Sequence, residues 1–364
     1  MSSRAPGHIL LGAHWNYHIL EAVKGDNTHA STVFKAKVVP HENTINAPQW
    51  FVGYYQSRFA GDATAQENLT RECQSYLLPG VASAACFRQL YDVVNDSTIA
   101  LEWLDTTLAE VKYQPDMRTY TLIKTFLRAA LTSCVVLERK NIPDYKPANI
   151  LISGIETDRV TAKVGDFGLV FPSGDRLKAQ PYSMRAPEVF LGQACTELSQ
   201  VWAVSAMLFC WIMPCVLGAW DSPHFFVNDA WSMAKIKRLF PGWKIPTPDE
   251  IEGHVLKVAV RAARRMSEDE RDVQAILPFE EETQKVEMPQ QLRDLLRLML
   301  VVNPDKRPSA SSVLASTEFR AFEKLVSIGS SAQSSKMSSL GLPLSERVWL
   351  EVVLRGQVPK KVEK

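Results

Sequence analysis

Four residues between positions 144 and 166 have the types and spacing that phosphoryl transfer requires. Asp144, Lys146 and Asn149 lie in the stretch N-I-P-D-Y-K-P-A-N-I-L, and Asp166 opens the triplet D-F-G. A phosphoryl group that passes through a loose transition state needs positioning and charge neutralisation more than covalent help. Asp144 would accept or orient the proton of a substrate hydroxyl, and Lys146 would neutralise the γ-phosphate. Asn149 and Asp166 would offer oxygen ligands to Mg²⁺.

The same residues also have a structural interpretation. Asp and Asn side chains favour turns, so Asp144 and Asn149, taken singly, are typical loop-capping residues. A lysine two positions after the acid and a second acid in D-F-G add independent features of one kind of site. The combination therefore favours chemistry over capping.

Composition places the chain among ordinary globular proteins. It has 364 residues, of which 46% are hydrophobic and 22% charged, and its net charge of +1 creates no field that would select nucleic acid or a membrane. Six cysteines without a C-x-x-C pair predict neither a disulfide framework nor a zinc site, and they favour a cytoplasmic or nuclear location. Residues 201–220 carry no charge, but they lack a flanking Lys/Arg cluster, which favours a buried helix over a membrane span.

The chain divides into a β-rich part and a helical part. After an extension at 1–15, residues 16–104 show strand patterns around one helix, and residues 105–323 show mainly helical periodicity. We expect an acidic, solvated insertion at 267–282, where docking of a basic partner is the less favoured alternative. We expect a flexible Ser- and Gly-containing tail at 324–364. The pattern predicts an α+β fold with two lobes and a ligand site between them.

Four motifs follow one another along the chain: D-Y-K-P-A-N, D-F-G, A-P-E and N-P-D-K-R-P-S-A. In this order and spacing the chain resembles the eukaryotic protein kinase family over about residues 16–323. The resemblance implies a two-lobed kinase fold that uses ATP and Mg²⁺ on a protein substrate. Lys146 followed by Pro147 is similar to the Ser/Thr type, and Arg185 with Tyr182 resembles the branch of cyclin-dependent, MAP and SR-protein kinases. It also implies a buried pair between Glu188 and Arg307.

The resemblance also implies a nucleotide site. The segment A-L-E-W-L-D-T-T-L resembles the kinase hinge, with Leu101 as the gatekeeper. Backbone groups of Glu102 and Leu104 would then bond adenine, and Val33 would pack on its face. Glu72 would be the helix acid of the family's Lys–Glu pair.

The chain departs from the family pattern at three places. Ile142 and Pro143 stand where His and Arg precede the catalytic acid, and Gln200 stands where an acid braces the loop after D-F-G, which points to altered regulation. Asp26, Thr28 and Ser31 replace the glycines of the phosphate-binding loop, which brings the backbone less close to phosphate. The third departure is a missing lysine.

Tyr54 occupies the place of the lysine on the third strand, and no lysine occurs from residue 38 to residue 111. Lys35 shares a strand face with Val33 and would replace the missing cation if it leaned toward the phosphates. A solvated strand lysine is the interpretation we favour, because lysines normally keep their ammonium in water.

Three functions therefore remain open. The first is an active Ser/Thr protein kinase, which retention of all four chemical residues favours. The second is a pseudokinase that acts as a nucleotide-binding or scaffold module, which the missing lysine favours. The third is a small-molecule phosphotransferase, against which the A-P-E and N-P-D-K-R-P stretches argue, because they match the protein-substrate branch. The expected partner is a protein with Ser or Thr, without nucleic acid or membrane, and the oligomeric state stays open.

Overall fold

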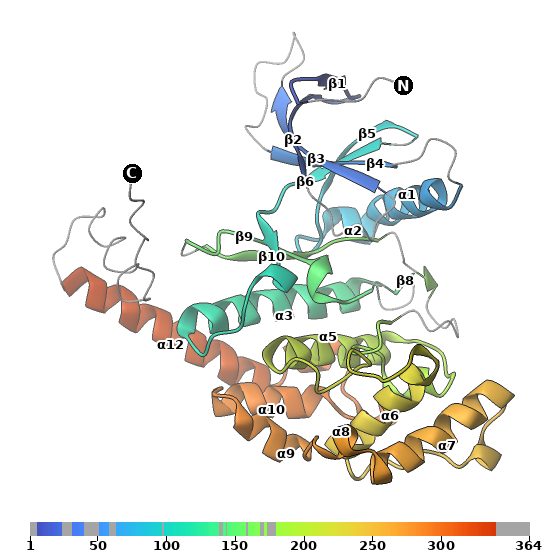
Figure 1. Ribbon diagram of the computed structural model, residues 1–364. Coiled ribbons are helices and arrows are strands. Elements are labelled where there is room, and N and C mark those ends of the chain that lie inside the picture. The colour runs from blue at the N-terminus through green and yellow to red at the C-terminus, as the bar shows by residue number, and fades with distance from the viewer. Residues whose placement is uncertain are drawn as a thin grey trace, which may run out of the picture.

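The chain folds into a small sheet-rich lobe above a larger helical lobe, as the predicted α+β class requires (Figure 1). The computed structural model describes residues 6–23, 31–39, 51–57, 63–96, 98–137, 141–142, 144–157, 159–167, 171–172 and 180–339. Asp26, Thr28 and Pro143, at which the sequence departs from the family pattern, lie outside the described residues.

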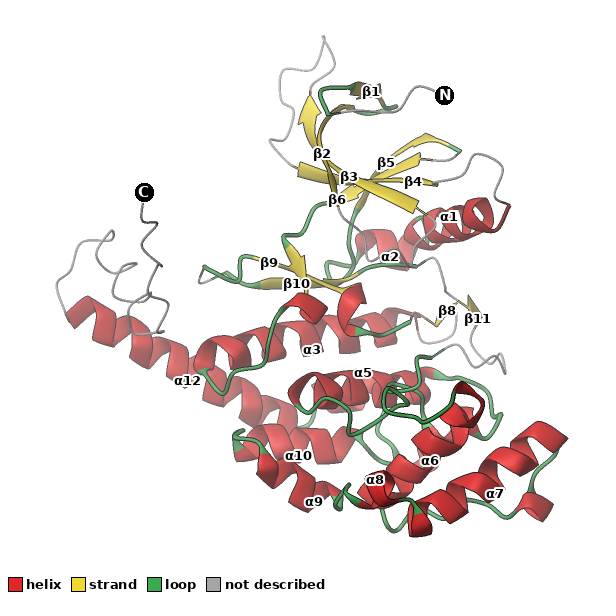
Figure 2. Cartoon of the chain, viewed as in Figure 1, coloured by secondary structure: helices red, strands yellow, loops and turns green. Residues whose placement is uncertain are grey.

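The small lobe is built on a six-stranded sheet with the order β1-β2-β3-β4-β6-β5. Its strands are β1 (Ile9–Leu11), β2 (Asn16–Val23), β3 (Ser31–Val39), β4 (Phe51–Ser57), β5 (Leu90–Asn95) and β6 (Thr98–Glu102). Helices α1 (Ala63–Tyr76) and α2 (Pro79–Ser83) lie beside it (Figure 2). Strand β3 alternates: Phe34, Ala36 and Val38 are buried in the core of the lobe, so the side chains of Val33 and Lys35 face the other way.

Short strands form two further small sheets. They are β7 (Thr106–Thr107), β9 (Ile150–Ser153) and β10 (Thr161–Val164) in one sheet, with β8 (Asn141–Ile142) and β11 (Phe171–Pro172) in another. The bridge between Phe87 and Val164 ties the small lobe to β10, which runs directly into D-F-G.

The large lobe is helical throughout. Its α-helices are α3 (Met117–Leu137), α4 (Pro187–Phe190), α5 (Glu197–Ile212), α6 (Asn228–Leu239), α7 (His254–Asp269), α8 (Arg271–Gln274), α9 (Phe279–Glu282), α10 (Gln290–Met299), α11 (Ala310–Leu314) and α12 (Thr317–Ser339). The short 3₁₀ helices are η1 (Leu108–Glu110), η2 (Pro147–Asn149), η3 (Phe225–Val227), η4 (Pro248–Glu250), η5 (Thr283–Lys285) and η6 (Pro304–Lys306).

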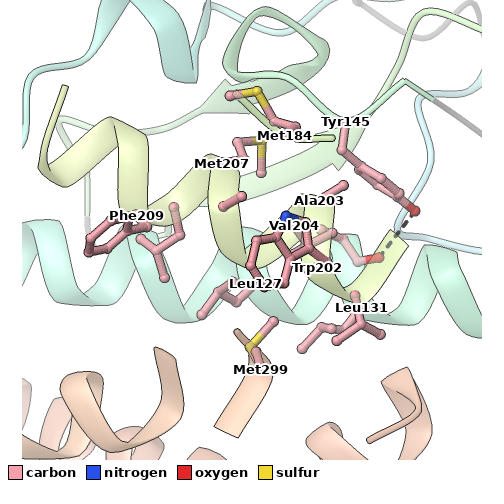
Figure 3. Close-up of a cluster of buried hydrophobic side chains, with 14 of the residues drawn as sticks. Leu127, Leu131, Tyr145, Met184, Trp202, Ala203, Val204, Met207, Phe209 and Met299 are labelled. Carbon is pink, nitrogen blue, oxygen red and sulfur yellow. Dashed lines mark hydrogen bonds between the residues drawn. The ribbon is translucent and has the colours of Figure 1, made fainter. Parts of the chain in front are cut away.

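Helices α3 and α5 form the centre of this lobe (Figure 3). Residues 201–209 of α5 are all fully buried, which confirms the predicted buried helix; the helix ends at Ile212, so the last residues of the uncharged run 201–220 lie outside it. Among the described residues one helix, α3, is long and apolar enough to cross a membrane. Since 61% of its apolar window is buried inside the protein, it has the character of a core helix.

The structure differs from two expectations about local segments. The predicted flexible tail from 324 is helical to Ser339, because α12 packs on α3 and α10 and buries Val326 completely. The predicted solvated insertion at 267–282 also belongs to the lobe, since Val273, Phe279 and Glu282 are buried. Because this stretch is mainly acidic and polar, its composition did not indicate that Val273 and Phe279 are buried.

Candidate active site

The loop that carries Asp144 is pinned to the helical core. Tyr145 is fully buried, and its hydroxyl lies 2.6 Å from the Ser133 hydroxyl on α3 (Figure 3). The Asn149 amide nitrogen donates to the backbone carbonyl of Asp144 at 2.7 Å, which closes the loop. The Lys146 ammonium lies 3.4 Å from the Asp144 carboxylate. The structure therefore brings Asp144, Lys146 and Asn149 together as the sequence predicts.

Asp144 has the environment of a reactive carboxylate. Its side chain is 9% exposed, and its Oδ1 has no hydrogen-bond partner among the described residues. Burial raises the pKa of Asp144, and the negative charge of Asp166 raises it further, whereas Lys146 lowers it. A buried carboxylate oxygen without a partner is costly unless a ligand or a substrate group satisfies it.

D-F-G places Asp166 in a constrained backbone conformation next to this loop. Asp166 has φ of 61°, in the left-handed region that non-glycine residues rarely adopt. The N–H of Gly165 donates to the backbone carbonyl of Asn149 at 3.0 Å, so the two segments are joined. Phe167 is buried against Tyr76 of α1, with ring centroids 4.8 Å apart. The ring anchors D-F-G to the small lobe and holds Asp166 near Asp144; Gly168 lies outside the described residues.

Glu72 on α1 faces the same acidic region. Withdrawal from water raises the pKa of Glu72, and the charge of Asp166 raises it further. The charge of Arg88 and a hydrogen bond from the Phe167 backbone N–H act in the opposite direction. Glu72 therefore reaches D-F-G, as expected for the helix acid, and the positive charge that it senses comes from Arg88.

Sequence reasoning missed Arg88. It follows the bridge residue Phe87, and its N–H donates to the carbonyl of Val164 at 3.0 Å. Its side chain is 5% exposed, and its Nε donates to the backbone carbonyl of Glu102 at 2.6 Å. The available signal was an arginine inside the run C-F-R-Q-L-Y, in a lobe where Tyr54 stands in place of the family's lysine.

The predicted hinge forms the junction after β6. Leu101 is fully buried and Leu104 is 8% exposed. Glu102 donates its N–H to the Gln89 carbonyl at 2.8 Å, and its carboxylate pairs with the Lys163 ammonium at 2.7 Å. Its carbonyl, one of the backbone groups that the resemblance assigns to adenine, accepts the hydrogen bond from Arg88.

Lys35 lies at the hinge end of the sheet. Its ammonium is 4.0 Å from the Glu21 carboxylate and 5.0 Å from the ring centre of Trp103, and its side chain is 27% exposed. It pairs with Gly53 on β4, one position from Tyr54, whose side chain lies outside the described set. Val33 pairs with Val23 across the β2–β3 hairpin. That Val33 packs on a base stays a prediction. The interpretation of Lys35 as a solvated strand lysine also stays a prediction, with phosphate binding as its alternative.

Hydrogen bonds of Arg185 and Gln180 anchor the segment after D-F-G. The residue before Asp144 is Pro143, so no arginine stands there to bind a phosphate on this segment. Arg185 donates to the carbonyl of Gln180 at 3.0 and 2.8 Å and to Asp229 at 3.0 Å. Gln180 in turn donates to the Ser199 carbonyl and accepts from the Ala186 N–H, both at 3.0 Å. These bonds hold the residues before A-P-E against α5 and α6.

The predicted buried pair between Glu188 and Arg307 is confirmed. The guanidinium bonds both carboxylate oxygens, at 2.7 and 3.0 Å, and its other donors reach the carbonyls of Leu198, Val301 and Val302. Gln200, which replaces the expected acid, donates to the sulfur of Cys195 at 3.4 Å.

The donor set fits a magnesium–nucleotide better than a metal held by protein alone. Within the described part of the chain, no group of three His, Cys, Asp or Glu side chains is placed to hold a metal. Magnesium is usually held by one or two carboxylates together with substrate phosphates. Asp166 and the amide oxygen of Asn149 suit that arrangement, because the nitrogen of the same amide already bonds the backbone.

Comparison with known proteins agrees with this geometry. A protein kinase domain profile matches residues 62–319. The chain is 28% identical over 261 residues to the stress-activated protein kinase jnk-1 of Caenorhabditis elegans, which covers 63% of this chain and 49% of that relative. It is 28% identical over 137 residues to the stress-activated protein kinase JNK of Drosophila melanogaster, which covers 35% of each. The chain thus spans half or less of the length of these relatives. It belongs to the protein kinase domain family.

Proposed function

We propose that this chain transfers the γ-phosphoryl group of ATP, with Mg²⁺, to Ser or Thr hydroxyls of a protein substrate. The observation that carries the proposal is the convergence of Asp144, Lys146, Asn149 and Asp166 around a buried carboxylate oxygen that has no partner among the described residues. A carboxylate held in this way is available to a hydroxyl donor.

Each of these residues has one task in the proposal. Asp144 accepts the hydrogen bond of the attacking hydroxyl and orients its oxygen. Lys146, close to Asp144, places a positive charge where the transferred group passes. Asn149 and Asp166 are the ligands that would hold Mg²⁺, which neutralises phosphate charge when bound. The φ of Asp166 supports this role, because strained backbone is retained at functional sites.

A pseudokinase is the second candidate, and two observations favour it. The small lobe has Tyr54 in place of the third-strand lysine, and the Arg88 guanidinium bonds the hinge carbonyl of Glu102. A nucleotide bound weakly, or without transfer, would follow from these two changes. The four large-lobe residues are nevertheless kept in place together, and for this reason we give catalysis precedence.

The proposal is tested with the purified chain, Mg²⁺ and γ-labelled ATP on a mixed protein substrate, followed by phosphoamino acid analysis. We expect label on Ser or Thr, and no label with Asp144→Asn or Asp166→Asn. The matched control is Asp305→Asn, which removes an exposed carboxylate far along the chain. Nucleotide binding with no transfer by the wild type would establish the pseudokinase alternative instead.

A further inference from the structure

We propose that Arg88 is a specificity residue that takes over the hinge carbonyl of Glu102, so that this chain does not use the 6-amino group of adenine to recognise its nucleotide. The inference rests on the proposed function, because it concerns how the same site selects its purine. The observation behind it is the hydrogen bond of 2.6 Å from Arg88 Nε to the Glu102 backbone oxygen.

The backbone fixes Arg88 at this position. Its N–H bonds the Val164 carbonyl, and the N–H of Val164 bonds the Cys86 carbonyl at 2.8 Å, so residues 86–88 run alongside the end of β10. The next residue but one after Val164 is Asp166. The Arg88 side chain therefore starts beside D-F-G and reaches the hinge carbonyl of Glu102.

The packing around Gly165 shows that the Arg88 side chain lies close to the residue before Asp166. A Cβ on Gly165 would lie 2.7 Å from Leu151 Cδ1 and 3.6 Å from Arg88 Cδ. Gly165, Leu151 and the Arg88 stem are thus neighbours, and they extend from D-F-G toward Glu102. Because Arg88 is only 5% exposed, its guanidinium occupies space inside the protein rather than in solvent.

The Arg88 guanidinium, bonded to the Glu102 carbonyl oxygen, disfavours a second hydrogen-bond donor on the same oxygen. A carbonyl oxygen has two lone pairs, so one hydrogen bond alone would not exclude the amino group of adenine. The Arg88 cation, however, forms a short charge-assisted bond, and an approaching amino hydrogen carries partial positive charge of the same sign. The amino group would also have to enter where the arginine side chain already lies. Leu104 is the other residue that the resemblance assigns to adenine, and its N–H would suit a ring-nitrogen acceptor.

The test compares ATP with purine riboside 5′-triphosphate, which keeps the ring nitrogens and lacks only the 6-amino group. Both are titrated with Mg²⁺ by calorimetry into the wild type, Arg88→Met and Arg320→Met. Arg320 is exposed and distant in sequence from the site, so it is the matched control for loss of an arginine. Thermal unfolding of each variant checks that it is folded.

We expect the wild type and Arg320→Met to bind the two triphosphates within about twofold of one another. Arg88→Met frees the carbonyl and is expected to prefer ATP by about fivefold, the ratio that one neutral hydrogen bond supplies.

A wild type that prefers ATP by fivefold or more would overturn the inference and leave the proposed function intact, whether or not Arg88→Met folds. If no protein binds either triphosphate, the proposed function fails together with the inference. The two failures are therefore distinguished by whether the wild type binds ATP at all.

Discussion

Replacing Glu188 with alanine is expected to lower the free energy of unfolding by about 3–5 kcal/mol, because it leaves the Arg307 guanidinium buried without its counter-charge. The two side chains are 5% and 0% exposed, and both oxygens of the carboxylate are bonded. The Ser199 hydroxyl, which donates to Glu188 at 2.8 Å, loses its acceptor as well. The carbonyls that remain around Arg307 satisfy hydrogen bonds but do not neutralise its charge.

An exposed pair in the same lobe provides the comparison. Arg297 and Glu280 approach to 2.6 Å, as closely as the buried pair, but their side chains are 45% and 56% exposed. Solvent screens such a pair, and its contribution to the free energy of unfolding is typically below about 1 kcal/mol. Glu280→Ala therefore removes a carboxylate of the same type with an equally close partner, and only burial differs.

Both variants and the wild type are unfolded with urea, and the midpoints are compared at a common slope. We expect Glu188→Ala to be far less stable than Glu280→Ala, and to lose phosphotransfer at temperatures where the latter keeps it, because Glu188 follows the segment that Arg185 and Gln180 anchor. Equal losses of stability in the two variants would refute the reasoning from burial.

Three further outcomes are expected. Asp166→Asn should raise the thermal midpoint, since it removes the charge that opposes Glu72 in the same region and asparagine tolerates left-handed φ; a lower midpoint in thermal scanning would contradict this. Gly218→Ala should destabilise by about 1–3 kcal/mol in urea, because φ is 86° and its Cβ would lie 3.0 Å from the Ser183 Cα; an unchanged midpoint would count against the packing described. The pKa of Glu72 is higher in the folded chain than in the unfolded one, so the folded chain binds more protons, and the free energy of unfolding should fall as pH rises from the ordinary glutamate range through neutrality. Glu72→Gln should flatten that slope in denaturation series across pH, and an identical slope in the variant would exclude Glu72 as its cause.

The sequence predicted best those parts of the site that lie close together along the chain. Asp144, Lys146 and Asn149 are placed by a loop of a few residues, so their spacing alone fixes their proximity. The family resemblance implied that Asp166 joins them, and the structure does so through a bond that was not predicted, from the Gly165 N–H to the Asn149 carbonyl. The Glu188–Arg307 pair spans a long sequence separation, and only the resemblance made it predictable.

The sequence predicted least where packing overrides local composition. The Ser-rich segment after 323 is helical because Val326 and its neighbours have a surface on α3 to cover, and helical stability comes largely from such contacts. Arg88 could not be assigned from propensity, since its role depends on a carbonyl 14 positions away and on the course of β10.

The central claim, that the Asp144 carboxylate serves an incoming hydroxyl, is tested most directly by measuring nucleotide binding and phosphoryl transfer on the same Asp144→Asn protein. The substitution keeps the size of the side chain and removes its charge. We predict Mg²⁺–ATP affinity within about threefold of wild type, and a transfer rate lower by at least the roughly 10²-fold that a general base contributes. Transfer at the wild-type rate by Asp144→Asn, with label still lost in Asp166→Asn, would contradict the assignment of Asp144.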